Sequence, residues 1–285
     1  MKNKPKVIVI IGQTATGKSS LAVKLAKKIG GEVISADSRQ VYKDLDIGTG
    51  KITKKEMKDI PHHLLDVANP KKKFTVVEYQ KKSISAMAEI LKRGKIPIIC
   101  GGTGFYIDAI TKGVVFPVVP PNLKLRKELE KKTLEQLFKI LKKLDRARAK
   151  NIDAKNTVRL VRAIEIAKAL GKVPKIKEVK PEYQFIKIGL CLPIDKLEKK
   201  VTKRVKQMFE DGLLKEIQKL KKKGVTDKRL KELGFEYYKP TRETVVHETI
   251  KYAKRQMTWF KRDKEIKWFS PTDYKKISQY LKSEI

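Results

Sequence analysis

The chain has 285 residues, of which 40% are hydrophobic, so it can bury the core of one large domain or of a core domain that carries an insertion. The basic N-terminus precedes only a short apolar run and no stretch reaches the length of a membrane span, which excludes a signal peptide and a membrane protein and predicts a cytoplasmic location. The 68 Lys and Arg residues exceed the 32 Asp and Glu residues and give a net charge of +36, which favours a phosphate-rich partner such as nucleic acid.

The first predicted element is a short buried strand, Val7–Ile11, which leads into a glycine-rich loop. Residues 12–19 read Gly-Gln-Thr-Ala-Thr-Gly-Lys-Ser and satisfy every fixed position of the phosphate-binding motif G-x-x-x-x-G-K-[ST]. Apolar residues at helical spacing then predict a helix that ends at Gly30-Gly31. A strand, a glycine loop and a helix are the context that this motif requires. The predicted phosphate-binding residues are Gly12, Gln13, Thr14, Ala15, Thr16, Gly17, Lys18 and Ser19.

The chemistry of this loop follows from its expected geometry. Gly12 and Gly17 permit backbone conformations and a close approach that a Cβ would block. Successive backbone N–H groups then point into one concavity at the positive end of the following helix. Lys18 can reach the terminal phosphates, and the Ser19 hydroxyl can hold a Mg²⁺ ion. The motif leaves the phosphate compound open, because nucleotides, pyrophosphates and phosphorylated small molecules all fit such a loop.

Three more strands are predicted, at Glu32–Ser35, Ile96–Cys100 and Phe185–Leu192. Helical stretches separate them, most clearly at Val76–Leu91. This alternation predicts an α/β fold in which helices cover both faces of a parallel sheet of the P-loop type. Cys100 and Cys191 lie far apart in apolar runs, so we expect two buried free thiols and no metal or redox pair.

The character of the sequence changes between residues 117 and 181. Two charged amphipathic helices, Leu123–Leu144 and Asn156–Leu170, are predicted there with no strand between them. We interpret residues 117–181 as a helical insertion that can move against a core domain made of residues 1–116 and 182–285. The last part of that core is predicted to be mostly helical, at residues 195–223 and 242–261.

Polar residues follow the second and third predicted strands, at the edge where ligands gather in an open α/β sheet. The Asp37 carboxylate is placed to accept a proton from a nucleophile that approaches the bound phosphate compound. Its alternative roles are the capping of the next segment and the coordination of Mg²⁺. Gly101-Gly102-Thr103-Gly104 allows a tight turn that presents the Thr103 hydroxyl, although this motif is weak in isolation.

Several further blocks of sequence can be compared with known families. They are Ile34–Tyr42, Asp46–Thr49, His62–Asp66, Gly101–Tyr106, Arg159–Glu165, Arg204–Met208, Leu233–Phe235 and Lys254–Phe260. Together with residues 12–19 they make the chain similar, over nearly its whole length and in the expected order, to the tRNA dimethylallyltransferase (tRNA isopentenyltransferase) family. Two isolated cysteines do not supply the zinc finger of the eukaryotic relatives, so the bacterial form is the closer match.

The resemblance implies a reaction. A dimethylallyl group would move from dimethylallyl pyrophosphate to the N6 amine of the adenosine 3′-adjacent to the anticodon in tRNA, giving N6-(dimethylallyl)adenosine and pyrophosphate. By resemblance, Lys18, Arg204 and a Mg²⁺ ion at Ser19 neutralise the charge that grows on the leaving group. Asp37 matches the general base of the family, and Thr103 matches the threonine that contacts the reacting groups. The adenine must leave its stack to reach them.

The resemblance also implies a set of tRNA-binding residues. They are Asp37, Ser38, Arg39, Gln40, Thr103, Arg126, Val158, Arg159, Leu160, Val161, Arg162, Lys254, Arg255, Gln256 and Trp259. The arginines in or beside the insertion would hold the anticodon stem-loop by its phosphates, and we expect a monomer. Trp259 either stacks on a base or packs in the core. Gly50 stands where the family has an alanine, a difference that we expect to matter little.

Other interpretations explain parts of the sequence. A small-molecule kinase would share the loop and Asp37, but it does not explain the ordered blocks, the charge or the insertion. A second alternative is an RNA-binding ATPase or switch protein. The sequence shows no convincing strand that ends in a metal-binding acid, which counts against that class. The charge alone could serve solubility or heat tolerance, although Glu does not keep pace with Lys. His62, His63 and Asp66 suggest a metal site, but without further ligands at suitable spacing a structural role is favoured.

Overall fold

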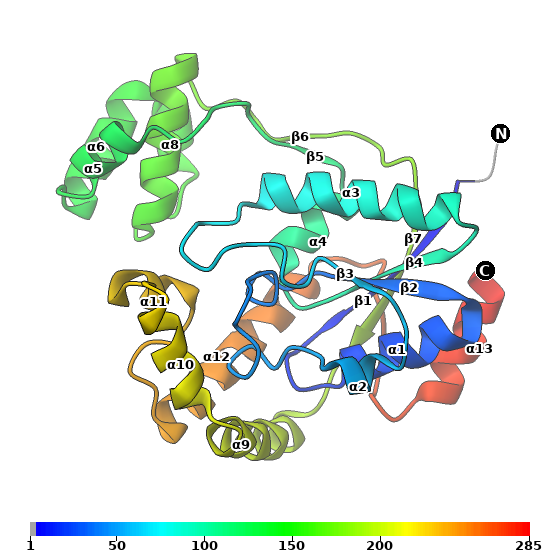
Figure 1. The fold of residues 1–285 in the computed structure, drawn as a ribbon. Coiled ribbons are helices and arrows are strands. Elements are labelled where there is room, and N and C mark those ends of the chain that lie inside the picture. The colour runs from blue at the N-terminus through cyan, green and yellow to red at the C-terminus, as the bar shows by residue number, and fades with distance from the viewer. Residues whose placement is uncertain (1–3) are drawn as a thin grey trace. The chain divides into compact units, whose positions relative to one another are not determined.

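The computed structural model describes residues 4–285, and contacts within the chain divide it into two compact units. The core unit contains the residues up to Gly113 together with Lys180–Ile285, and the insertion unit is Val114–Val179. Figure 1 shows the elements of both units along the chain. Within the described residues, no helix combines the length and the apolar character needed to cross a membrane.

The core unit is built on a six-stranded sheet in the order β3-β2-β4-β1-β7-β8. Its strands are β1 (Lys6–Gly12), β2 (Gly31–Ser35), β3 (His62–His63), β4 (Ile96–Cys100), β7 (Gln184–Leu190) and β8 (Lys267–Phe269). Every neighbouring pair is parallel, which confirms the predicted α/β class. The strands β3 and β8 were missed, because two or three residues are too few to show a periodic pattern.

Helices cover both faces of this sheet, as Figure 1 shows. Successive side chains of β1 point to opposite faces. On one face Val7 and Val9 pack with residues of α3 (Val76–Lys92) and α4 (Gly104–Thr111). On the other face Ile8 and Ile10 pack with α1 (Lys18–Ile29) and α13 (Tyr274–Glu284). Burial on both faces explains why the central strands are apolar throughout instead of alternating.

The C-terminal helices of the core unit carry several of the predicted site residues. They are α9 (Ile194–Glu210), α10 (Leu213–Lys222), α11 (Asp227–Leu233) and α12 (Arg242–Phe260), and a short α2 (Lys54–Met57) precedes β3. Val201 and Val205 of α9 pack against Val245 and Ala253 of α12. Because this packing holds α9 and α12 together, it fixes Arg204 on α9 and Gln256 on α12 relative to each other.

The insertion unit is a small helical body with its own core. It contains the paired antiparallel strands β5 (Val114–Val115) and β6 (Lys177–Glu178) and the helices α5 (Leu123–Leu129), α6 (Leu134–Leu144), α7 (Arg146–Lys150) and α8 (Thr157–Leu170). Because β5 and β6 pair with each other, the unit runs from Val114 to Val179, whereas the sequence suggested 117–181.

The single helix predicted over Leu123–Leu144 is wrong, because the structure breaks it before Leu134. Thr133 and Gln136 form a capping box, in which the Thr133 hydroxyl accepts the Gln136 N–H at 3.3 Å and the Gln136 side chain accepts the Thr133 N–H at 3.1 Å. A T-x-x-Q sequence before an apolar run is a recognised helix start, so this break was visible in the sequence.

A buried carboxylate gives His63, the second histidine of the His62-His63 pair, a structural partner. At the start of β2, oxygens of Glu32 lie 2.7 Å from His63 Nε2, 2.7 Å from Arg93 and 3.2 Å from Lys95. Burial would raise the pKa of Glu32, but the hydrogen bonds from Arg93, His63 and Lys95 outweigh it and lower the pKa to about 2. This cluster supports the structural role that was favoured for His63.

Candidate active site

The phosphate-binding loop joins β1 to α1 through two glycines with positive φ. Gly12 has φ +130°, and a Cβ on it would lie 2.0 Å from the carbonyl oxygen of Leu190 in β7. Gly17 has φ +87° and forms the N-cap of α1. Both positions therefore need glycine, the first for the close approach to β7 and the second for its left-handed backbone.

Side-chain amides brace this loop from two sides. Gln13 accepts a hydrogen bond from the backbone N–H of Leu192 at 2.8 Å. Gln256 accepts the N–H of Thr14 at 2.8 Å and donates to the carbonyl of Gly102 at 3.0 Å. Gln256 is only 5% exposed, so it links the phosphate-binding loop to the loop after β4. We therefore assign Gln256 to the frame of the site, although the resemblance implied a direct contact with tRNA.

Lys18 begins α1 and folds back over the loop, where its ammonium donates to the carbonyl of Gln13 at 2.6 Å. Burial lowers the pKa of Lys18 from 10.5 to about 8, and this outweighs the opposing charges of Cys100 and Asp37. Within residues 4–285, no carboxylate forms an ion pair with this ammonium. A phosphate anion in the loop would supply the missing charge and raise the pKa again.

Asp37 and Thr103 lie on the loops that follow the neighbouring strands β2 and β4. Oδ1 of Asp37 accepts the backbone N–H groups of Arg39 at 2.8 Å and Gln40 at 3.3 Å. The Thr103 hydroxyl accepts the N–H of Ser38 at 2.9 Å and donates to the Ser38 hydroxyl at 3.3 Å. Parallel strands bring both side chains to one edge of the sheet, the edge at which ligands bind in this class of fold. Within the described chain, Oδ2 of Asp37 accepts no hydrogen bond, so it is available for a proton.

Arg204 brings α9 to the phosphate-binding loop. One guanidinium nitrogen lies 3.5 Å from the Thr14 hydroxyl, and the other donates to the carbonyl of Thr49 at 3.0 Å. Burial lowers the pKa of Arg204, while the charges of Asp37 and Glu236 act in the opposite direction. An arginine stays charged under such conditions, so the site keeps a second cation beside Lys18.

Gly50 lies directly against the guanidinium of Arg204. Its φ is +54°, and a Cβ at this residue would lie 1.9 Å from a guanidinium nitrogen of Arg204. An alanine here would displace that guanidinium. Because the contact is with the far end of a flexible side chain, the expectation that this difference from the family matters little stays a prediction.

Tyr252 adjoins the site and was not among the predicted residues. It lies one helical turn before Gln256 on α12, and its hydroxyl donates to the carbonyl of Gly102 at 3.4 Å. Burial raises the pKa of Tyr252 to about 12. The spacing of four residues from Gln256 was the only signal that could have placed Tyr252 on this face of the helix.

Glu236 is a second acidic group in this region that the sequence did not single out. A Cβ on Gly234 would lie 2.5 Å from the Glu236 carboxylate and 3.8 Å from Arg39 Nε, so the acid folds back toward the loop after β2. Burial raises the pKa of Glu236 from 4.5 to about 7, against the attraction of Arg39 and Arg204. The Glu236 side chain therefore changes charge close to neutral pH.

Replacing Glu236 with glutamine is expected to stabilise the protein at pH 8.5 but not at pH 4.5. The folded state binds the Glu236 proton more tightly than the unfolded state, so folding stability falls as the pH rises from 4.5 to about 7. Glutamine removes this loss, worth on the order of 2 kcal/mol for a partly exposed group. Urea unfolding at both pH values measures the effect, and equal differences between variant and wild type at the two pH values would contradict it.

The remaining predicted tRNA-binding residues of the core unit differ in accessibility. The Arg39 guanidinium is held in place by one hydrogen bond, which it donates to the carbonyl of Glu232 at 2.6 Å. Trp259 is partly buried and donates from its indole to Asp108 at 3.2 Å, which favours packing over stacking on a base. Lys254 and Arg255 are exposed on α12. These last two are the residues of the α12 set best placed to meet a phosphate.

Gln40 contacts the loop that also binds Arg204. Its amide donates to the carbonyls of Thr49 and Gly50, both at 3.4 Å. Ser38 is tied to Thr103, as described above. The segment of residues 37–40 therefore has its polar side chains arranged before any ligand is present.

In the insertion unit, a buried carboxylate engages two of the predicted arginines. Glu165 accepts hydrogen bonds from Arg126 at 2.9 and 2.8 Å, and it also pairs with Arg162. It accepts the backbone N–H of Asn122 at 2.6 Å as well. Burial would raise the pKa of Glu165, but the bonds from Arg126 and Arg162 outweigh it and lower the pKa. We therefore assign both arginines first to the framework of the unit.

The other predicted residues of α8 divide by face. Leu160 and Val161 are buried in the core of the insertion unit, so their side chains are not available to tRNA. Val158 is 77% exposed, and Arg159 is exposed with only a distant partner, Asp153 at 3.8 Å.

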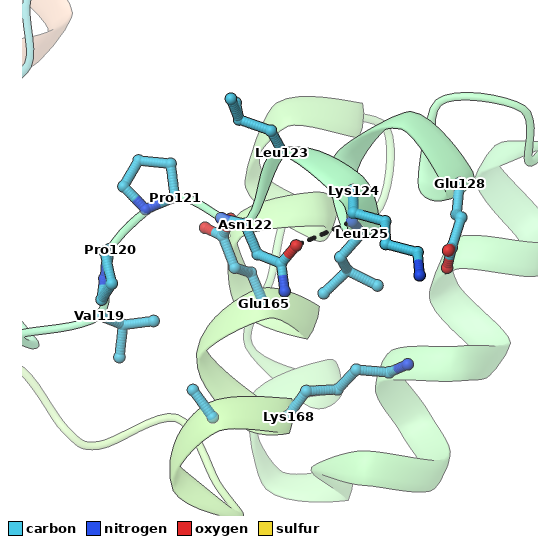
Figure 2. Close-up of a pocket in the computed structure, with 11 residues that line it drawn as sticks. Val119, Pro120, Pro121, Asn122, Leu123, Lys124, Leu125, Glu128, Glu165 and Lys168 are labelled. Atoms are coloured by element: carbon cyan, nitrogen blue, oxygen red, sulfur yellow. Dashed lines mark hydrogen bonds between the residues drawn. The ribbon is translucent and has the colours of Figure 1, made fainter.

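A pocket of about 690 Å³ opens between the segment 119–125 and α8, with Glu165 on its wall (Figure 2).

The donor set beside the phosphate-binding loop fits a Mg²⁺ ion held mainly by substrate. Ser19 presents a hydroxyl on the first turn of α1. Among residues 4–285, no group of three or more His, Cys, Asp or Glu side chains could hold a metal by itself. Mg²⁺ commonly keeps waters and takes substrate phosphate oxygens with one or two protein ligands, so one hydroxyl beside a phosphate-binding loop is compatible with it.

The fold and the site define a P-loop α/β protein that can hold a phosphate compound next to a carboxylate and two cations. The chain belongs to the IPP transferase family, whose profile matches residues 40–263. It is 39% identical over 283 residues to the tRNA dimethylallyltransferase of Anoxybacillus flavithermus, a match that covers 94% of this chain and 91% of that protein. The predicted resemblance to this family is confirmed.

Solved structures agree with this assignment. The tRNA isopentenylpyrophosphate transferase of Bacillus halodurans is 34% identical, with a TM-score of 0.73 and coverage of 98% of this chain and 96% of that chain. A eukaryotic dimethylallyltransferase acting on tRNA is 28% identical, with a TM-score of 0.78 and coverage of 97% of this chain and 75% of that chain. The similarity to the bacterial structure therefore extends over nearly the full length of both chains.

Proposed function

We propose that the chain transfers the dimethylallyl group of dimethylallyl pyrophosphate to the N6 amine of the adenosine on the 3′ side of the anticodon in tRNA. We further propose that it does so as a monomer in the cytoplasm. The observation that carries the proposal is the meeting of the phosphate-binding loop, Asp37 and Thr103 at one edge of the sheet in a chain of this family. The names of the relatives supply the donor group and the tRNA acceptor.

The reaction is a substitution at the allylic carbon. The N6 nitrogen forms a bond to that carbon, the bond from the carbon to the pyrophosphate oxygen breaks, and N6 loses one proton. Lys18 and Arg204 hold the pyrophosphate end, with the backbone N–H groups of the loop, as negative charge grows on the leaving oxygen. When bound beside Ser19, Mg²⁺ would neutralise part of the same charge.

Asp37 and Thr103 serve the acceptor side of the reaction. Asp37 takes the N6 proton on Oδ2, because Oδ1 is already committed to the backbone of Arg39 and Gln40. The Thr103 hydroxyl, fixed by Ser38, orients the reacting groups. An adenine amine is a weak nucleophile, so this alignment supplies much of the rate enhancement.

The surface charge supports binding of the tRNA backbone. The net charge is +36, and exposed cations include Lys254 and Arg255 on α12 and Arg159 in the insertion unit. We propose that residues 117–181, the insertion identified from the sequence, contact the anticodon arm through such cations. Phosphate contacts of this kind make affinity fall with increasing salt.

The test is a transfer assay with labelled dimethylallyl pyrophosphate, Mg²⁺ and unmodified tRNA. We expect label on the adenosine 3′-adjacent to the anticodon, and no label when this adenosine is replaced by guanosine. The guanosine tRNA is the matched control, because it keeps the backbone and the anticodon loop. Absence of label, together with ATP consumption on a small acceptor, would instead favour the kinase alternative.

A further inference from the structure

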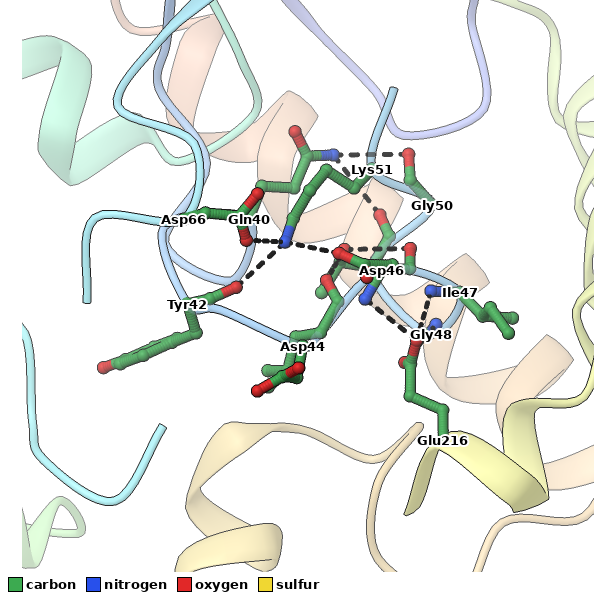
Figure 3. A network of polar contacts seen from close by, with 12 residues as sticks. Gln40, Tyr42, Asp44, Asp46, Ile47, Gly48, Gly50, Lys51, Asp66 and Glu216 are labelled. Carbon is green, nitrogen blue, oxygen red and sulfur yellow. Dashed lines mark hydrogen bonds and ion pairs between the residues drawn. The ribbon is translucent and has the colours of Figure 1, made fainter. Parts of the chain in front are cut away.

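A buried carboxylate outside the proposed catalytic set holds the loop of residues 46–51, which we call the Arg204 support loop. One oxygen of Glu216, on α10, accepts the backbone N–H groups of Asp46 at 3.0 Å and Ile47 at 2.8 Å. Its other oxygen accepts the N–H of Gly48 at 3.1 Å. Figure 3 shows Glu216 aimed at this turn of the backbone. Three backbone donors on one carboxylate make a charge-assisted anchor.

Tyr237 completes this anchor from the segment after α11. Its hydroxyl donates to Glu216 at 2.9 Å, and the residue is only 1% exposed. A Cβ on Gly48 would lie 2.6 Å from the tyrosine ring, so the ring packs directly on the support loop. Burial and the charge of Glu216 raise the pKa of Tyr237 well above its ordinary value, which keeps the hydroxyl as a donor.

The far end of the support loop is fixed by Lys51. Its ammonium pairs with Asp46 at 2.7 Å and Asp66 at 2.6 Å and donates to the carbonyl of Tyr42 at 2.9 Å. The Lys51 side chain is only 5% exposed, whereas both of its carboxylate partners are exposed, so the ammonium is held in place by several contacts and not by one strong buried pair. Both ends of the six-residue segment are thus tied, as Figure 3 shows.

Between these two ties the support loop presents its backbone to Arg204. The Thr49 carbonyl accepts the guanidinium at 3.0 Å, and Gly50 leaves the space that the guanidinium occupies. The other end of the same guanidinium reaches the Thr14 hydroxyl in the phosphate-binding loop. Contacts within residues 4–285 use two of the five N–H donors of this arginine, so the others can meet phosphate oxygens.

We propose that Glu216 is a positioning residue for the pyrophosphate-binding site, which acts through the support loop to hold Arg204 against the phosphate-binding loop. The inference rests on the proposed function for the identity of the donor. The part of the inference that concerns contact between Arg204 and a pyrophosphate group holds whether or not the chain transfers a dimethylallyl group. Glu216 itself touches neither substrate.

The decisive variant is Glu216→Gln, which keeps the shape of the side chain. Each oxygen of Glu216 faces backbone or hydroxyl donors, so the amide NH₂ of glutamine would face a donor in either orientation. The support loop should shift and Arg204 should lose its fixed position. We expect the kcat/KM for dimethylallyl pyrophosphate to fall about 30-fold, while the KM for tRNA changes by less than about 2-fold.

The matched control is Glu32→Gln, which makes the same chemical change in another buried carboxylate of the core unit. Glu32 binds His63, Arg93 and Lys95 at the start of β2, away from the strand ends that carry the site. This variant should lower the melting temperature without changing the constants for the donor. Tyr237→Phe is the milder partner variant, because Glu216 keeps its three backbone donors, and we expect a donor effect of about 3-fold.

Thermal stabilisation by inorganic pyrophosphate gives a readout that needs no turnover. Wild type and Glu32→Gln should be stabilised alike, Tyr237→Phe should need about 3-fold more pyrophosphate for the same shift, and Glu216→Gln at least about 10-fold more. If wild type transfers no dimethylallyl group, the proposed function fails but this titration still decides the inference. Donor and tRNA constants that change together in Glu216→Gln, or an equal loss in Glu32→Gln, would overturn the positioning role. If Glu216→Gln does not fold, the same comparison is made with Tyr237→Phe.

Discussion

Asp37→Asn is expected to lower the rate of dimethylallyl transfer by about 10³-fold and to leave tRNA binding within about 3-fold of wild type. The asparagine side chain keeps an oxygen for the backbone N–H groups of Arg39 and Gln40, so the loop should retain its shape. What it loses is the second oxygen that accepts the N6 proton. Single-turnover assays with saturating tRNA isolate this chemical step from binding and product release.

Asp37→Ala is the companion variant that separates the two roles of the carboxylate. Alanine removes the proton acceptor and also the cap on the backbone of Arg39 and Gln40, so tRNA binding should weaken further than in the asparagine variant. A transfer rate near that of wild type in Asp37→Asn would remove Asp37 from the role of general base. In that case its function would be limited to shaping the loop.

The sequence correctly predicted the strands and the helix around the candidate site, because local patterns specify them. The strand before Gly12 and the helix after Lys18 depend on apolar spacing, and they appear as β1 and α1. The loops with Asp37 and Thr103 follow predicted strands, and parallel pairing of β2 with β4 brings them together. The sheet order itself depends on long-range pairing, which no local pattern records.

The residues implied to bind tRNA show why the surroundings of individual side chains could not be predicted. A motif names residues but not the faces on which they lie, and Leu160 and Val161 belong to the apolar face that forms the core of the insertion unit. The resemblance placed Arg126 among the phosphate contacts, yet its guanidinium meets Glu165, which lies far from it in sequence. Gln256 likewise became an internal brace only through contacts with two distant loops.

Two glutamates were not predicted as important, for the same reason. Glu216 and Glu236 acquire their surroundings from segments that are remote in sequence, the support loop for the first and the Arg39 region for the second. Neither glutamate lies in a recognisable motif of its own. Their importance is a property of tertiary packing, so only the folded chain exposes it.

Lys18→Ala is expected to reduce the kcat/KM for dimethylallyl pyrophosphate by about 10²-fold or more, with little change in the KM for tRNA. Removing one partner of a buried charge pair costs several kcal/mol of binding free energy. In Lys18→Ala, Arg204 would be the one remaining cation of the two that hold the pyrophosphate. Kinetics with each substrate varied in turn measure the effect. Equal losses for donor and tRNA would argue against a specific role at the pyrophosphate.

The lowered pKa of Lys18 adds a pH dependence that the variant should abolish. Because burial brings this pKa to about 8, the empty site loses the Lys18 proton as the pH rises above 8, and pyrophosphate then binds only if the proton is taken up again. Affinity for pyrophosphate should therefore fall by up to about 10-fold per pH unit above 8 in wild type and stay nearly flat in Lys18→Ala. Calorimetry in buffers of different ionisation enthalpy would show uptake of one proton in wild type at pH 9. Proton uptake that persisted in Lys18→Ala would assign the titration to another group.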